Sequence, residues 1–183
     1  MGNSNSLLTD EKIQELAGKT HFNQNEIKSI VKRYSSHIIP EDSTTGITRS
    51  SFLSIPELTC TPYADMLYNI YTDSQKSTMT PEEFLMLFSM LSSKATIKEK
   101  QKLMFQVFDI SKDGIIGFDE VFRVYKKMFS AGFTDEQLTE IVNSVLTSQS
   151  LKTPGTIDFD EFCKMMAPME LREKLTIELQ LSI

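Results

Sequence analysis

Residues 109–120 read "DISKDGIIGFDE", and this stretch determines how the rest of the chain is interpreted. Oxygen-bearing side chains stand at its positions 1, 3, 5 and 12, and Gly114 stands at position 6. A twelve-residue calcium loop needs oxygen ligands at positions 1, 3, 5, 7, 9 and 12, with a glycine at position 6 for a sharp turn. The stretch therefore predicts a site for a hard divalent cation.

The spacing selects four side chains and one main-chain carbonyl as ligands: Asp109, Ser111, Asp113, the carbonyl of Ile115, and Glu120. Gly117 at position 9 has no side chain, so a water molecule has to serve there. Three carboxylates neutralise a dication that prefers oxygen to nitrogen or sulfur. We expect one Ca²⁺ in this loop, with Mg²⁺ as an alternative occupant at rest. The competing interpretation is a solvated acidic turn.

An internal repeat surrounds this loop. Four segments begin with Ile or Met and have another apolar residue five positions later, at steps of 32, 37 and 41 residues: "ITRSSF" (47–52), "MTPEEF" (79–84), "IGFDEV" (116–121) and "IDFDEF" (157–162). This is the repeat length of a helix–loop–helix unit. We expect an all-α protein with two lobes of paired units, in which Ile47 faces Met79 and Ile116 faces Ile157 in short β bridges.

Capping residues mark where the helices begin. Asn23 with Glu26, and Thr80 with Glu83, have the spacing of capping boxes, and Thr96 with Glu99 repeats it. Thr61 followed by Pro62 predicts a further start, because proline is tolerated at the first helical position.

The loop at 150–161 keeps the shape of a calcium loop but loses its ligands. Gly155 and Glu161 are retained, whereas position 3 is Lys152 and position 5 is Pro154. A lysine directs a positive charge at the ion, and proline offers no side-chain oxygen. We expect a structural brace here instead of a metal site.

Two more loops are also predicted to be braces. In 72–83, Lys76 occupies position 5 and Ser77 replaces the glycine. The first loop, roughly 38–51, is two residues longer than the template and ends in Ser51 instead of an acid.

The polar stretch "SSKAT" (92–96) predicts a linker between the lobes. The expected organisation is an N-terminal segment and helix (1–22), a pair with degenerate loops (23–93), a pair with the competent loop (94–168) and a tail (169–183). Residues 175–183 alternate apolar and polar side chains, which indicates an extended segment. This segment is either a terminal strand on the C-terminal lobe or a built-in plug for a partner groove.

Composition excludes several classes of protein. Of 183 residues, 40% are hydrophobic and 24% charged, as in a soluble globular protein, and the net charge of −6 disfavours nucleic acid as a partner.

Cys60 and Cys163 are far apart and are expected to be buried apolar residues in a reducing compartment. Two histidines, His21 and His37, lie in no metalloprotease pattern. "AGKT" (17–20) lacks the preceding glycine of a phosphate loop, so Gly18 is interpreted as a helix terminator. No enzyme is predicted.

The N-terminus "MGNSNS" matches the myristoylation pattern, with Gly2 as the acceptor. No basic patch accompanies it, and a single acyl chain holds a membrane only marginally. We expect a cytoplasmic protein with weak, reversible peripheral contact with membranes if it is acylated.

At these residues the chain resembles the calcineurin B-like branch of the EF-hand proteins, which includes calcineurin B, the calcineurin B homologous proteins and the calcium- and integrin-binding proteins. The motifs that carry the resemblance are "MGNSNS", "LTDEKIQELAGKTHF", "FLSIPEL", "EKQKLMFQVFDISKDG" and "IDFDEFCKMM". Members of this branch have more loops able to bind metal than this chain, in which only 109–120 matches. This difference favours a single metal-binding event that orders the C-terminal lobe.

The resemblance implies a hydrophobic groove that binds an amphipathic helix of a partner. Methionines suit such a groove, and six are candidates for its lining: Met86, Met90, Met104, Met128, Met165 and Met166. The expected function is a calcium-responsive regulatory subunit, of the kind that binds a phosphatase catalytic subunit. The alternative is a constitutive adaptor for the cytoplasmic tail of a transporter or integrin-type membrane protein, with one structural Ca²⁺ or Mg²⁺.

Overall fold

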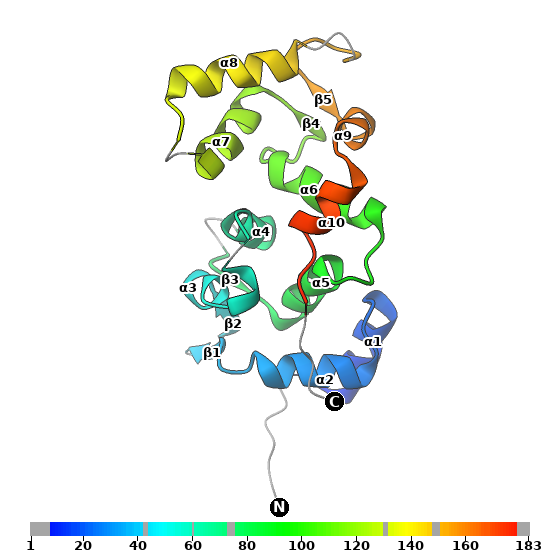
Figure 1. Ribbon diagram of the computed structural model, residues 1–183. Coiled ribbons are helices and arrows are strands. Elements are labelled where there is room, and N and C mark those ends of the chain that lie inside the picture. Colours follow the sequence, from blue (N-terminus) through cyan, green and yellow to red (C-terminus); the bar gives the residue numbers. More distant parts are fainter. Residues whose placement is uncertain are drawn as a thin grey trace, which may run out of the picture. The chain divides into compact units, whose positions relative to one another are not determined.

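The computed structural model describes residues 8–41, 44–59, 61–72, 76–129, 132–147 and 151–178. The chain divides into two compact units, one formed by residues 1–96 with 174–183 and the other by residues 97–173. Helices and their connecting loops make up most of each unit, and the strands are short (Figure 1). The predicted all-α class of paired helix–loop–helix units with β bridges is confirmed.

The first unit contains most of the strands. Its elements are, in chain order, α1 (Asp10–Lys19), α2 (Gln24–Arg33), β1 (Ile38–Glu41), β2 (Thr44–Thr48), α3 (Arg49–Leu53), η1 (Pro56–Leu58), α4 (Ala64–Tyr71), β3 (Thr78–Met79) and α5 (Pro81–Leu91). Two predicted capping boxes are confirmed, at Asn23 with Glu26 and at Thr80 with Glu83.

Two predictions about helix ends in this unit are wrong. The helix expected to begin at Thr61 and Pro62 begins at Ala64, because the Ala64 N–H donates to the Thr61 carbonyl and closes a turn first. Gly18 does not terminate α1, which runs on to Lys19, and the N–H of Thr20 then donates to the Leu16 carbonyl.

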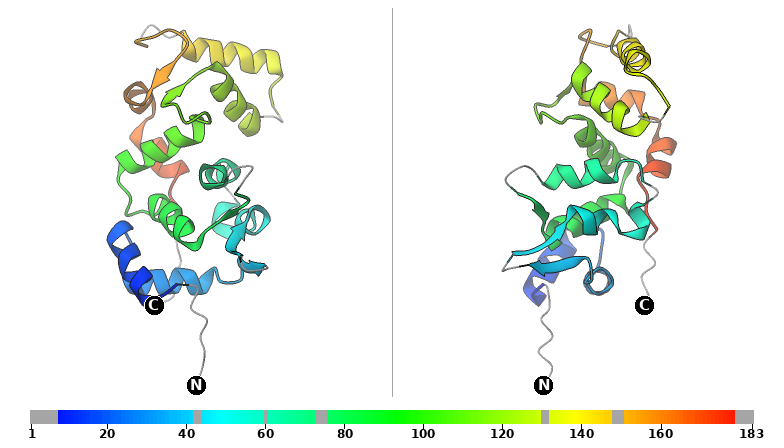
Figure 2. Two further views of the ribbon diagram at one scale, coloured as in Figure 1. Left: turned by 180° about the vertical axis from the view of Figure 1, so that it is seen from behind. Right: turned by 90° about the vertical axis from the view of Figure 1, so that its left-hand side faces the viewer.

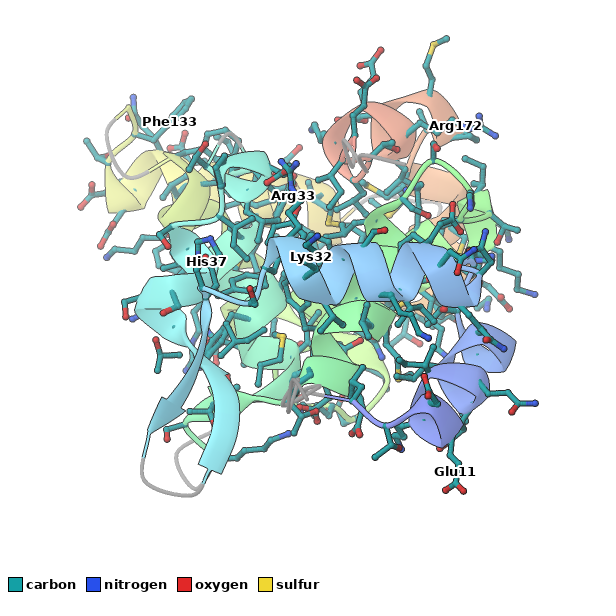
Figure 3. All side chains as sticks on the ribbon, turned by 90° about the horizontal axis from the view of Figure 1, so that it is seen from below. Glu11, Lys32, Arg33, His37, Phe133 and Arg172 are labelled. Carbon is teal, nitrogen blue, oxygen red and sulfur yellow. The ribbon has the colours of Figure 1, made fainter. Side chains whose placement is uncertain are left out.

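The first loop folds as a β-hairpin instead of a wrapped loop. Strands β1 and β2 pair antiparallel from Ile38 opposite Ile47 to Glu41 opposite Thr44, and β2 continues the sheet to β3. Figure 2 shows this hairpin beside α3 in both views. The extra length noted in the sequence therefore forms paired strands. Figure 3 shows Lys32 and Arg33 on the last turn of α2 and His37 just before the hairpin.

Aromatic rings fill the core of the first unit. The Tyr34 ring centroid lies 5.3 Å from that of Phe84 and 5.2 Å from that of Phe88. The buried Tyr68 hydroxyl lies 2.9 Å from the Ile47 carbonyl and 2.8 Å from the Ser77 carbonyl, and its single proton is shared between these two acceptors. One phenol therefore ties α4 to the strands. The predicted pairing of Ile47 with Met79 is confirmed.

The second unit repeats the paired arrangement with shorter bridges. It consists of α6 (Ile97–Phe108), β4 (Ile115–Ile116), α7 (Phe118–Phe129), α8 (Asp135–Leu146), β5 (Ile157–Asp158), α9 (Phe159–Met165) and α10 (Pro168–Lys174). Ile116 pairs with Ile157, as predicted. The Phe162 ring packs against Phe105 and Phe108, at centroid distances of 5.4 and 5.8 Å.

The segment after α10 packs on the first unit. The Ile177 N–H donates to the Leu91 carbonyl at 2.9 Å, and both Leu175 and Ile177 are buried. The expectation of a strand on the C-terminal lobe is therefore wrong for residues 175–178, because the free carbonyl at the end of α5 accepts this N–H. Residues 179–183 lie outside the described part of the chain.

We expect Gly46→Ala to destabilise the protein, because a Cβ at this position would lie 2.7 Å from the Thr78 Oγ1 of the neighbouring strand. Such overpacking costs about 1–3 kcal/mol in the free energy of unfolding, measured by urea denaturation. Gly18→Ala is the matched control, since nothing lies within 4 Å of its added methyl and alanine favours the helix. Equal stability of the two variants would contradict the assigned strand pairing.

Candidate metal centre

The loop at 109–120 joins two helices of the second unit, since α6 ends at Phe108 and α7 begins at Phe118. Two backbone φ angles within it are positive, 60° at Lys112 and 83° at Gly114. The glycine adopts this angle freely because it has no Cβ. The backbone therefore makes its sharp turn where the sequence places glycine.

The Asp109 carboxylate organises the first half of the loop. Its Oδ1 accepts the N–H of Asp113 and its Oδ2 accepts the N–H of Gly114, each at 3.1 Å. The Asp113 Oδ1 accepts the N–H of Ile115 at 2.9 Å. Both aspartates therefore face the backbone of their own loop.

The Glu120 carboxylate closes the second half. Its Oε1 accepts the Ser111 N–H at 2.9 Å, and its Oε2 accepts the Gly117 N–H at 3.0 Å. Glu120 also lies in the first turn of α7. One side chain thus connects the start of the exit helix to the opposite side of the loop.

The donor set is chemically suited to a hard dication, because every predicted ligand atom is oxygen. Asp109 and Glu120 are half-buried, while Ser111, Asp113 and Ile115 are exposed to solvent and give an ion access. Within the described ranges, no three Asp, Glu, His or Cys side chains form a group that could hold a metal. In this conformation each of these carboxylate oxygens accepts one backbone N–H, and its second lone pair is available to an ion.

The degenerate loops place lysine among their acids, a feature that the sequence interpretation treated only as a loss of ligands. Lys76 pairs with Glu83, and Lys152 pairs with Asp158. A lysine at one ligand position with an acid retained at another, position 12 for Lys76 and position 9 for Lys152, is the signal that could have predicted these pairs. Two residues singled out in the sequence, Gly2 and Cys60, lie outside the described residues.

The candidate groove residues do not share one environment. Met104 is fully buried core, whereas Met86 and Met165 are 40% and 44% exposed, and the other three methionines are half-buried. In the second unit Phe129 and Phe133 are also exposed. Figure 3 labels Phe133, which lies just before α8. Cys163 is half-buried instead of buried, and burial raises the pKa of its thiol.

None of the described helices combines the length and the apolar character that crossing a bilayer requires.

Helix–loop–helix pairs joined by short bridges between their loops define the EF-hand class of protein. The family model for an "EF-hand domain pair" matches residues 75–128, which include the loop at 109–120. Calcineurin B type 1 of Dictyostelium discoideum is 32% identical over 97% of this chain and 98% of its own length. Calcineurin B of Naegleria gruberi is 31% identical over 98% of this chain and all of its own length. Calcineurin B type 2 of Homo sapiens is 27% identical over 86% and 92%.

The chain belongs to the calcineurin B-like family of EF-hand proteins. The resemblance identified from the sequence motifs is thereby confirmed along nearly the whole chain.

We expect Gly114→Ala to lower the free energy of unfolding by about 1 kcal/mol in the presence of EDTA, because alanine is strained at a φ of 83°. Gly117→Ala is the control within the same loop, where nothing lies within 4 Å of the added methyl. Urea denaturation of both variants measures the difference. Equal losses would mean that the left-handed turn at Gly114 is absent in solution.

Proposed function

We propose that this chain is a calcium-binding regulatory subunit with a single calcium site in the loop at 109–120. The carrying observation is that the proposed ligand acids of this loop accept backbone N–H groups, whereas in the loops at 72–83 and 150–161 a lysine ammonium also pairs with an acid. Asp109, Ser111, Asp113, the Ile115 carbonyl and Glu120 would hold the ion. When bound, Ca²⁺ supplies two positive charges that offset most of the charge of the three proposed ligand carboxylates, Asp109, Asp113 and Glu120.

Glu120 is the residue through which the loop acts on the fold. Its carboxylate reaches the Ser111 N–H, while its own backbone belongs to the first turn of α7. A change in what this carboxylate binds therefore shifts α7, and α7 carries Tyr125 and Phe129, whose rings pack together at 5.9 Å. Displacement of such a helix uncovers apolar surface in sensor proteins of this fold.

The partner we propose is a protein that presents an amphipathic helix, and specifically a phosphatase catalytic subunit. The family relatives are themselves named as subunits of calcineurin. The exposed side chains of Phe129, Phe133 and Ile141 give the second unit apolar surface for such a helix. The role is regulatory and not catalytic. A cytoplasmic location and acylation at Gly2, with weak membrane contact, remain predictions.

We expect Ca²⁺ at a hundred times its dissociation constant to stabilise the wild-type protein by about 2.7 kcal/mol, and Glu120→Gln to abolish most of this gain. Asp119→Asn is the matched control, because Asp119 is an adjacent acid at a position that does not ligate. Thermal unfolding with Ca²⁺ or EDTA, together with binding of a hydrophobic dye, measures both effects. If the wild-type protein unfolded at the same temperature with Ca²⁺ and with EDTA, the proposed calcium site would be contradicted. A dye response that persists in Glu120→Gln would contradict the switch.

Affinity purification of the tagged full-length chain from cells, with Ca²⁺ or EDTA, tests the partner. We expect mass spectrometry to identify a phosphatase catalytic chain, recovered in greater amount with Ca²⁺. Recovery of only a transporter or integrin-type membrane protein, at equal levels in both buffers, would favour the constitutive adaptor and contradict the proposal.

A further inference from the structure

In two of the degenerate loops, a lysine stands at a position that a metal ligand occupies in a calcium-binding loop. In the loop at 72–83, Lys76 occupies position 5, and its Nζ contacts both carboxylate oxygens of Glu83 at position 12. In working loops the glutamate at position 12 ligates the ion through both oxygens. Lys76 therefore engages the same two atoms that a divalent cation would engage.

Both oxygens of the Glu83 carboxylate have donors from the chain. Its Oε2 also accepts the Thr80 N–H at 2.9 Å, completing the capping box of α5. Burial alone would raise the pKa of Glu83, yet its pKa is lowered, because the Lys76 ammonium and the Thr80 donors favour the charged form. Donors from the chain itself therefore favour the ionised form of Glu83.

The loop at 150–161 also pairs a lysine with an acid, but here the lysine stands at position 3 of the loop. Lys152 stands at position 3, its Nζ pairs with Asp158 at position 9, and its backbone N–H donates to the Glu161 Oε1. The Glu161 Oε2 accepts the Asp158 N–H at 3.0 Å. The ammonium and the carboxylate favour each other's charged forms, which raises the pKa of Lys152 and lowers that of Asp158.

We propose that Lys76 and Lys152 are internal counterions that take the place of the divalent cation in the loops at 72–83 and 150–161. Both loops are then closed without metal, and calcium does not act on them. The loop at 109–120 lacks a lysine at positions 3 and 5, since these are Ser111 and Asp113. The loop at 109–120 would take a metal ion, whereas each of the other two loops would use the ammonium group of its own lysine.

The first test compares Lys76→Met, Lys76→Arg and Lys126→Met in EDTA, so that no metal contributes. Lys126 is the matched control because it forms an exposed ion pair with Asp135 at 2.8 Å. We expect the melting temperature of Lys76→Met to fall by about 2–4 °C more than that of Lys126→Met, and Lys76→Arg to restore most of it. The amide resonance of Thr80, which bonds the Glu83 carboxylate, should shift in Lys76→Met and return towards its wild-type position in Lys76→Arg. Equal melting temperatures for the two methionine variants, with an unchanged Thr80 resonance, would overturn the proposal.

The second test adds Ca²⁺ to the Glu120→Gln variant, in which the loop at 109–120 is disabled. We expect the amide resonances of Thr80 and Asp158 to remain in place up to millimolar Ca²⁺. A saturable shift of either resonance would show that its loop takes calcium and would overturn the internal counterion there. The EDTA comparison does not depend on whether the loop at 109–120 binds calcium, so a failure of that site and a failure of this proposal give different results.

Discussion

The glutamate at the twelfth position of a loop needs a donor for each of its two carboxylate oxygens, and the described structure of three loops depends on how that need is met. Glu83, Glu120 and Glu161 each use one oxygen to accept the backbone N–H of the residue at position 9. This bond fixes the start of the exit helix. The other oxygen reaches across the loop to a donor at position 3 or 5, and so closes it.

The loops differ in whether a lysine charge accompanies that second donor. In the loop at 109–120 the donor is the neutral backbone N–H of Ser111, at position 3. In the loop at 72–83 it is the Lys76 ammonium, and in the loop at 150–161 a lysine supplies both its N–H and a charge beside Asp158. The first loop ends in Ser51, which has no carboxylate for such a bond, and its chain forms the β1–β2 hairpin. Loss of the glutamate and loss of the loop shape therefore occur together.

Features set by local chemistry could be predicted from the sequence. The capping boxes at Asn23 and Thr80 and the pairing of Ile116 with Ile157 depend on neighbours that the repeat itself supplies. Features that depend on contacts between residues far apart in the chain could not be predicted from the sequence. The segment around Ile177 packs on α5 because a carbonyl at the end of that helix lacks a donor, and nothing in the alternating pattern of the tail identifies that partner.

Side chains that act against their usual chemistry were also missed. Lys100 shares the apolar face of α6 with Leu103 and Met104 and is only 1% exposed, and its pKa falls to about 8 because burial, and then the nearby Arg172, disfavour the charged form. For the candidate site, spacing alone supplied all five proposed ligands, and their role stays a prediction. It could not show that the carboxylates bond to the backbone, because those contacts depend on the folded conformation of the loop.

The proposed function depends on one loop, at 109–120, that takes an external cation while the loops at 72–83 and 150–161 do not. Isothermal titration calorimetry of the full-length, metal-free protein with Ca²⁺ measures this directly through the binding stoichiometry. The account predicts one calcium ion per chain. A stoichiometry of two or more, or no binding heat across the millimolar range, would contradict it.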